Sequence, residues 1–223
     1  MMKKGFVFNA VYVLLINVMI KPVYLFGIDR NVQLIVGERY GLYYTFFSLA
    51  FILNILSDLG IQGFNLRFAS QNPHLIQKNV QKFLGLKLWL GILFFAVYFS
   101  IGSFSNYPQE EFLLFLLVGL MLWLNALLLF LRSNIASKGL YMLDSTLSAL
   151  DKFIMIVVCG VFVVQDELRA QLTIELFALF QVMAYLVPIA LATMVLMRQH
   201  VPLKPKANRL FSIAILRKSF PYA

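Results

Sequence analysis

The sequence is poor in charged residues and in residues that bind metals. Of its 223 residues only 13% are charged, and it has one cysteine, Cys159, and two histidines, His74 and His200. A single cysteine excludes an intramolecular disulfide, and the histidines are too far apart for their spacing to indicate a metal site. The sequence also lacks a nucleophile elbow, a phosphate-binding loop and a zinc-protease helix. We therefore expect neither an enzyme nor a metal or other cofactor.

Apolar residues take the place of the missing charges. They make up 61% of the chain, and the mean hydropathy is +0.82, whereas globular domains are roughly half apolar and a quarter charged. This composition predicts an all-α integral membrane protein. The net charge of +9 does not indicate nucleic-acid binding, because the basic residues lie in short segments between apolar runs and lack interleaved aromatic residues.

Six apolar stretches are each close to the roughly 20 residues that a membrane span needs. They cover residues 6–27, 40–64, 83–104, 112–131, about 147–164 and 172–197. We expect a bundle of six transmembrane helices within residues 1–218, ending in a basic connector. The first stretch is too long for a cleaved signal peptide and no cleavage site follows it. Residues 219–223 are interpreted as a possible start of a seventh span in a longer protein, with a short cytoplasmic tail as the alternative.

Lysine and arginine are distributed unequally between alternate segments. Thirteen lie in the segments on the side of the N-terminus, three lie in the other set, and the remaining three lie within the apolar stretches. Positive residues favour the cytoplasmic side of a membrane. The distribution therefore predicts that both ends of this chain are cytoplasmic.

An amide and a carboxylate interrupt the second apolar stretch. Asn54 and Asp58 are four residues apart, so they face the same way on a helix. An ionisable group at the bilayer centre costs about 2.5 to 3.5 kcal/mol and usually faces a bundle interior or a wet cavity. We therefore expect this helix to turn one face away from lipid. A structural ion pair, or a cap at the helix end before Gly60, is the alternative.

The first apolar stretch carries a polar stripe. Asn9, Asn17 and Lys21 are spaced by eight and four residues, so they lie near one face of a helix. Pro22 removes a backbone donor and disfavours helical geometry at Lys21. The stripe predicts a face lining a polar interior, and hydrogen bonds between packed helices explain the two asparagines equally well. Asn125, alone in the fourth stretch, is interpreted as a packing residue.

Two further lysines lie within the predicted spans. Lys87 and Lys152 are each within about two helical turns of the cytoplasmic end of a predicted span, so their ammonium groups can reach the headgroups. Both are interpreted first as interfacial anchors. Asp151, beside Lys152, is interpreted as part of a partly solvated helix start.

Several short motifs resemble a known family. They are GERYGLY at 37–43, SDLGI at 57–61, RSNIASKG at 132–139, DSTLSALDK at 144–152 and LRKSFPY at 216–222. Together they resemble the N-terminal half of bacterial polysaccharide and O-antigen flippases of the Wzx type, in the multidrug/oligosaccharidyl-lipid/polysaccharide exporter superfamily. The motifs are loose, but the likeness covers most of the chain.

The resemblance implies two six-helix lobes with a cavity between them, of which this chain supplies the first. The implied function is alternating-access transfer of an undecaprenyl-diphosphate-linked oligosaccharide across the bacterial inner membrane, often with ion coupling. The implied partners are the lipid-linked oligosaccharide, membrane lipids and a second lobe in cis or in trans.

The polar residues described above are the candidates for contacting this implied substrate. We expect Lys21, with Arg30, to contact the anionic head group, and Asn9, Asn17, Asn54 and Asp58 to line the cavity; Lys87 and Lys152 are further candidates. Two other functions fit the sequence. One is an ion-coupled exporter of small molecules from the same superfamily, and the other is a membrane scaffold for glycan assembly that transports nothing.

Overall fold

A computed structural model describes residues 2–71, 73–105, 108–206 and 208–219, with side chains described at 11–67, 79–105, 108–206, 208 and 211–219. Within this part of the chain the secondary structure is entirely helical. The elements are α1 (Met2–Pro22), the π-helix η1 (Val23–Asp29), α2 (Arg30–Val36), α3 (Arg39–Asp58), α4 (Ile61–Gln71), α5 (Pro73–Phe104), the 3-10 helix η2 (Gln109–Glu111), α6 (Phe112–Ala136), α7 (Tyr141–Val164), α8 (Asp166–Arg169), α9 (Ile174–Arg198) and α10 (Arg209–Ser219).

Six helical segments of the described chain are long and apolar enough to cross a membrane. They are Val11–Val36, Arg39–Asp58, Asn79–Phe104, Gln109–Ala136, Tyr141–Val164 and Ile174–Arg198. The predicted fold class, an all-α bundle of six transmembrane helices, is confirmed. The protein is therefore a multi-pass membrane protein.

The first span extends to Val36, beyond its predicted end at residue 27. Pro22 has helical dihedral angles (φ −65°, ψ −37°), and the chain continues through the π-helix η1 into α2. Lys21 is helical as well, so the expectation of a disrupted backbone at Lys21 is wrong. The wider hydrogen-bonding pattern of the π-helix follows the proline instead and accommodates its missing N–H.

The second span is shorter than predicted. Leu59 and Gly60 have positive φ angles of 43° and 74°, which end α3 and start a separate helix, α4. The Leu59 carbonyl, freed at this break, accepts a hydrogen bond of 2.9 Å from the Ser219 hydroxyl of α10. The predicted connector 198–218 thus contains a helix that is fixed to the α3–α4 joint. Residues 220–223, where a seventh span was predicted to start, lie outside the described residues.

The fifth span begins earlier than predicted. α7 starts at Tyr141 rather than near residue 147, and its first turn is fixed to α6 by Arg132, whose Nε donates to Asp144 Oδ1 at 2.8 Å. Lys152 consequently lies eleven residues from one end of α7 and twelve from the other, about 17 Å from either. This is mid-span, where a lysine cannot act as an interfacial anchor.

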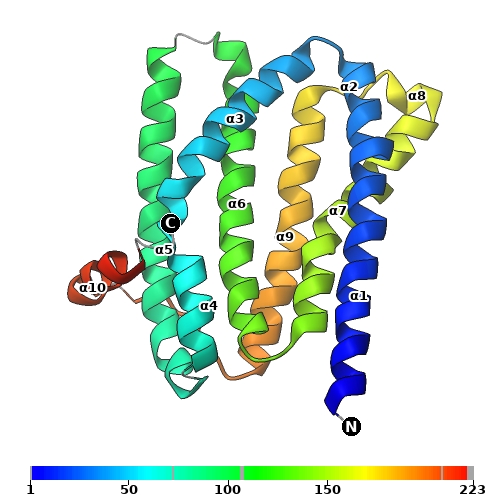
Figure 1. Ribbon diagram of the computed structural model, residues 1–223. Coiled ribbons are helices and arrows are strands. Elements are labelled where there is room, and N and C mark those ends of the chain that lie inside the picture. Colours follow the sequence, from blue (N-terminus) through cyan, green and yellow to red (C-terminus); the bar gives the residue numbers. More distant parts are fainter. Residues whose placement is uncertain (1, 72, 106–107, 207, 220–223) are drawn as a thin grey trace.

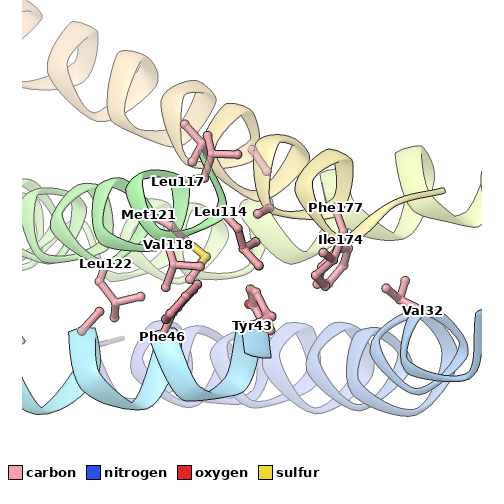
Figure 2. Packing of buried hydrophobic residues seen from close by; sticks show 14 of the residues in the cluster. Val32, Tyr43, Phe46, Leu114, Leu117, Val118, Met121, Leu122, Ile174 and Phe177 are labelled. Atoms are coloured by element: carbon pink, nitrogen blue, oxygen red, sulfur yellow. The ribbon is translucent and has the colours of Figure 1, made fainter. Parts of the chain in front are cut away.

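The core lies where α3 crosses α6 and where α6 packs against α9 (Figure 1). Figure 2 shows the cluster: Phe46 and Tyr43 of α3 face Val118 and Leu122 of α6, and Phe177 completes it from α9. α7 packs against α9, and α1 packs against the outer side of α7. α6 is the central helix of the bundle, since most of its residues are buried.

The two ends of the bundle carry opposite charges. The end of α4, the start of α5, the α6–α7 turn and the segment after α9 lie at the end where the N-terminus lies (Figure 1), and most of the lysines and arginines lie in or next to these segments. We call this the basic end. At the opposite end Arg39 joins two helices, with ion pairs of 3.0 Å to Glu111 and 2.7 Å to Glu175.

Candidate functional site

One face of α3 borders two pockets along its whole length. From Tyr40 to Asp58 the lining residues recur every three or four positions, as one helical face requires; they are Tyr40, Tyr43, Tyr44, Phe47, Phe51, Asn54, Ile55 and Asp58. We call the pocket beside Lys152 the tyrosine pocket and the pocket beside Lys87 the Asp58 pocket. Phe51 borders both, so the pockets adjoin at that ring.

The tyrosine pocket encloses about 210 Å³. The Lys152 ammonium lies 4.7 Å from the centre of the Tyr24 ring and 5.7 Å from that of Tyr185, within the range of cation–π attraction. It also forms an ion pair of 3.2 Å with Asp151, which is buried. The lysine is therefore stabilised inside the membrane region by two aromatic rings and one carboxylate.

A buried glutamine connects three spans at the wall of this pocket. The Gln181 carbonyl accepts a hydrogen bond of 2.8 Å from the Tyr43 hydroxyl, and its amide donates one of 3.0 Å to the Tyr24 hydroxyl. Tyr24 is buried in the π-helix η1, so the irregular backbone after Pro22 presents this ring to the pocket. The network fixes two of the tyrosines, while Tyr44 remains half exposed.

The charges of the tyrosine pocket do not sum to a positive site. Asp29 of η1 lines the pocket together with Lys152, and Asp151 is the direct partner of the lysine. Asn125 of α6, which was interpreted as a packing residue, also lines the pocket. The pocket thus offers one ammonium, the Asp29 carboxylate, amides and phenol hydroxyls to a ligand, while Asp151 balances the lysine from outside the lining.

The Asp58 pocket encloses about 230 Å³ and is built around a second lysine–aspartate pair. Lys87 of α5 is only 2% exposed and donates a short hydrogen bond to Asp58 Oδ1. The other carboxylate oxygen of Asp58 accepts from the Gln62 N–H at 3.3 Å, in the first turn of α4. The interpretation of Lys87 as an interfacial anchor is wrong, because its side chain turns inward to a buried carboxylate.

The structure unites Asn54 and Asp58 as their spacing predicted. Both line the Asp58 pocket, and Asn54 Oδ1 accepts a hydrogen bond of 2.6 Å from the Ser57 hydroxyl. The structural alternative also holds, since Asp58 both forms an ion pair and bonds to α4. Whether these groups touch a substrate stays a prediction.

The polar stripe of the first span does not extend this face. The Asn17 amide donates to Ser145 Oγ at 3.0 Å and to the Val13 carbonyl at 2.8 Å, which is helix packing against α7. Lys21 and Arg30 are exposed and line neither of the two pockets. The Asn9 side chain lies outside the described residues.

Sequence reasoning missed most of the tyrosine pocket. Tyr24, Asp29, Tyr40, Gln181 and Tyr185 were not singled out, although all five line it. One available signal was Gln181, a buried amide in the middle of an otherwise apolar span, where polar side chains face a partner or a cavity. A second signal was the group of three tyrosines at 40, 43 and 44, because they cluster on one helical face.

Neither pocket holds the ligand set of a metal site. Among the described side chains, no group of three histidine, cysteine or acidic residues is close enough to bind a metal ion. What the arrangement provides is charge pairing and hydrogen bonding within a membrane bundle. Comparison with protein-family models, with curated proteins and with solved structures finds no match for this chain, so its function is argued from this geometry and from the motifs in its sequence.

Proposed function

We propose that this chain forms one lobe of a membrane transporter that carries a lipid-linked oligosaccharide across the bacterial cytoplasmic membrane, in the manner of the Wzx-type flippases that its motifs resemble. The observation that carries the proposal is the placement of Lys152 and Lys87, two lysines inside the bundle that face adjoining pockets along α3. Ionisable groups at such depth usually mark a substrate or ion pathway.

The chemistry of the pockets suits such a substrate. An undecaprenyl diphosphate needs cations in a desolvated site, where a charged hydrogen bond is stronger than in water. The sugars need groups that replace their hydration, and the tyrosine pocket supplies phenol hydroxyls, the Asn125 amide and aromatic ring faces. In this proposal the two lysines bind the diphosphate and the tyrosine pocket binds the first sugars.

The lysine–aspartate pairs give this binding a mechanism. Each lysine is balanced by an aspartate, Lys152 by Asp151 and Lys87 by Asp58. A diphosphate that binds the lysine must replace the carboxylate, and the released carboxylate then needs a proton or a cation because an unpaired buried charge is costly. Substrate exchange at the lysine and ion uptake at the aspartate are coupled in this way.

The remainder of the glycan requires space outside the two pockets, which enclose only about 210 and 230 Å³. We propose that a second six-helix lobe, in cis or in trans, completes the cavity over the α3 face. Lys21 and Arg30, both exposed, contact the head group only if that lobe also covers their side of the first span. The basic end of the bundle faces the cytoplasm, with both termini of this chain on that side.

A specific observation favours a second candidate function. Asp29 and Asp151 accompany Lys152, and a pocket of tyrosine rings and carboxylates attracts organic cations. An ion-coupled exporter of small cationic molecules therefore fits the same pocket. The two functions differ in the charge of the ligand, which is negative for the flippase and positive for this exporter.

The deciding experiment compares Lys152→Gln and Lys87→Gln in the complete protein in its host, at matched membrane abundance. We expect each to reduce surface glycan about tenfold or more, since each removes a charged hydrogen bond to the diphosphate, with accumulation of lipid-linked oligosaccharide in the cytoplasmic leaflet. The control is Lys138→Gln, because Lys138 donates to the Gln199 carbonyl at the basic end and lines neither pocket.

Other outcomes point to the other functions. Normal surface glycan with lost efflux of a fluorescent organic cation would establish the exporter. Normal flux of both, with lowered abundance or lost binding of glycan-assembly proteins, would establish the scaffold. If Lys21→Ala and Lys21→Arg both leave surface glycan unchanged, Lys21 has no role in glycan transport.

A further inference from the structure

A third cavity lies on the outer side of the bundle, away from the face of α3. It is an apolar groove of about 690 Å³ between α5 and α10. Leu86, Trp89, Leu93 and Ala96 line it from α5, and Ser212 and Leu216 line it from α10. Trp89 is 63% exposed, so the groove opens toward the lipid rather than into the bundle.

The length of the groove matches one leaflet of a bilayer. Its α5 wall extends from Leu86 to Ala96, ten residues or about 15 Å at the helical rise. Half of a hydrocarbon core of roughly 30 Å is the same length. A single acyl chain lying along α5 would therefore fill the groove, which runs from the half of the span Asn79–Phe104 nearer the basic end to just beyond its middle.

The end of the groove nearest the basic end of the bundle is polar and positively charged. The Lys82 ammonium lies 4.9 Å from the centre of the Phe211 ring on α10. Lys206, two residues before the groove-lining Asn208, is exposed. Lys82 and Lys206 thus place two ammonium groups beside the point where a lipid head group would lie.

This arrangement is held by a close backbone crossing. The Lys206 N–H donates to the Gln81 carbonyl at 3.0 Å, and the Lys206 carbonyl lies against Gly85, where a Cβ would collide with it. The connector before α10 can approach α5 this closely only because residue 85 is glycine. The position of Lys206 relative to the groove is therefore fixed.

α10 has the pattern of a helix that lies at a membrane surface. Ile215 is buried against the bundle, Ile213 is 59% exposed, and Arg217 and Lys218 are exposed. Figure 1 shows α10 outside the group of spanning helices, beside α4 and α5. An exposed isoleucine beside exposed basic residues suits the boundary between acyl chains and anionic head groups.

We propose that this groove binds one anionic phospholipid, with an acyl chain along α5 and a head group held by Lys82 and Lys206. Because the bound lipid sits on the far side of α5 from the face of α3, it is distinct from any transported substrate. A net anionic lipid is favoured over a zwitterionic one, since a lysine near an anionic membrane surface strengthens binding about fivefold.

Tryptophan fluorescence tests this directly. The chain has two tryptophans, and Trp123→Phe leaves Trp89 as the reporter in the groove. The purified full chain is placed in bilayers that contain brominated phosphatidylglycerol or brominated phosphatidylcholine, and the quenching gives relative binding constants. We expect the binding constant of phosphatidylglycerol at Trp89 to be at least about fivefold higher than that of phosphatidylcholine. The double variant Lys82→Gln/Lys206→Gln should abolish this preference.

Two controls isolate the groove. Trp89→Phe leaves only Trp123, which packs against Gly91 and is only partly exposed, and its quenching should show no preference between the lipids. Lys138→Gln/Arg198→Gln removes the same amount of charge from the basic end without touching the groove, and it should leave the preference at Trp89 intact. Native mass spectrometry of the unmodified chain should retain phosphatidylglycerol over phosphatidylcholine.

Three results would overturn the proposal. Equal quenching of Trp89 by both lipids would mean ordinary annular lipid. No quenching by either would mean that protein, a second copy or another helical segment, covers the groove. A preference that survives Lys82→Gln/Lys206→Gln would exclude these lysines as the head-group site.

Discussion

The Lys152 ammonium faces the ring of Tyr24 at 4.7 Å, a contact that joins the first span to the fifth. Tyr24 follows Pro22 in the π-helix of the first span, while Lys152 is at the middle of the fifth. The contact places a positive charge at the depth of a bilayer where a lone lysine is least stable. Its stability must therefore come from its neighbours.

Removing Lys152 should destabilise the protein by leaving Asp151 without its ion-pair partner. Asp151 is buried, so we expect Lys152→Met to lower the free energy of unfolding by about 3 kcal/mol or more. Asp151→Asn/Lys152→Met removes both charges and should recover most of that loss. Thermal unfolding in detergent measures both; equal melting temperatures for the single and double variants would show that the ion pair is not the cause.

Asp58 and Lys87 should be coupled energetically. We expect a double-mutant cycle of Asp58→Asn and Lys87→Met to give a coupling energy between about 1 and 3 kcal/mol, because the two charges are in direct contact and the lysine is buried. Denaturant unfolding of the four proteins supplies the values. Additive effects would mean that the pair contributes only through its separate packing.

Adding a methyl group at Gly119 should destabilise the protein. A Cβ at residue 119 would lie 2.6 Å from the Tyr98 ring, and Tyr98 is stacked on Phe115 with ring centres 4.0 Å apart, so it has little room to move. We expect Gly119→Ala to destabilise by about 1 to 3 kcal/mol. The matched control is Gly41→Ala in α3, which has open space around it and should be neutral or stabilising by up to about 1 kcal/mol.

The membrane orientation can be read with single cysteines. The native Cys159 is fully buried, so an impermeant maleimide should not reach it. We expect Glu110→Cys, at the end opposite the basic end, to be labelled in intact cells, and Lys204→Cys to be labelled only after permeabilisation. Labelling in the reverse order would place the basic end outside and would contradict the proposed orientation.

Features that depend on neighbouring residues in the sequence were predicted correctly, whereas features that depend on contacts between helices were not. The pair Asn54 and Asp58 was placed on one face correctly because helical periodicity alone decides it. Lys152 was assigned to the interface because apolar content marks the start of α7 near residue 147, whereas the ion pair between Arg132 and Asp144 lets the helix begin at Tyr141.

Long-range contacts explain the other differences. The partner of Lys87 is on another helix, and no pattern within the third apolar stretch reveals that the lysine turns inward toward Asp58. Pro22 was expected to disrupt the helix, but packing of Tyr24 and Ile28 against α7 stabilises a π-helix after it. Gln181 contacts Tyr24 and Tyr43 across more than 130 residues of sequence, a relation that only the fold supplies.

The break at Leu59 and Gly60 connects the Asp58 pocket to the surface helix α10. Asp58, the last residue before the break, is the partner of Lys87, and the Leu59 carbonyl is the acceptor for Ser219 at the end of α10. A ligand that draws Lys87 away from Asp58 alters the same joint to which the surface helix is tied. By linkage, any effect of pocket occupancy on the affinity for lipid at α10 must be matched by an equal effect of that lipid on the affinity of the pocket.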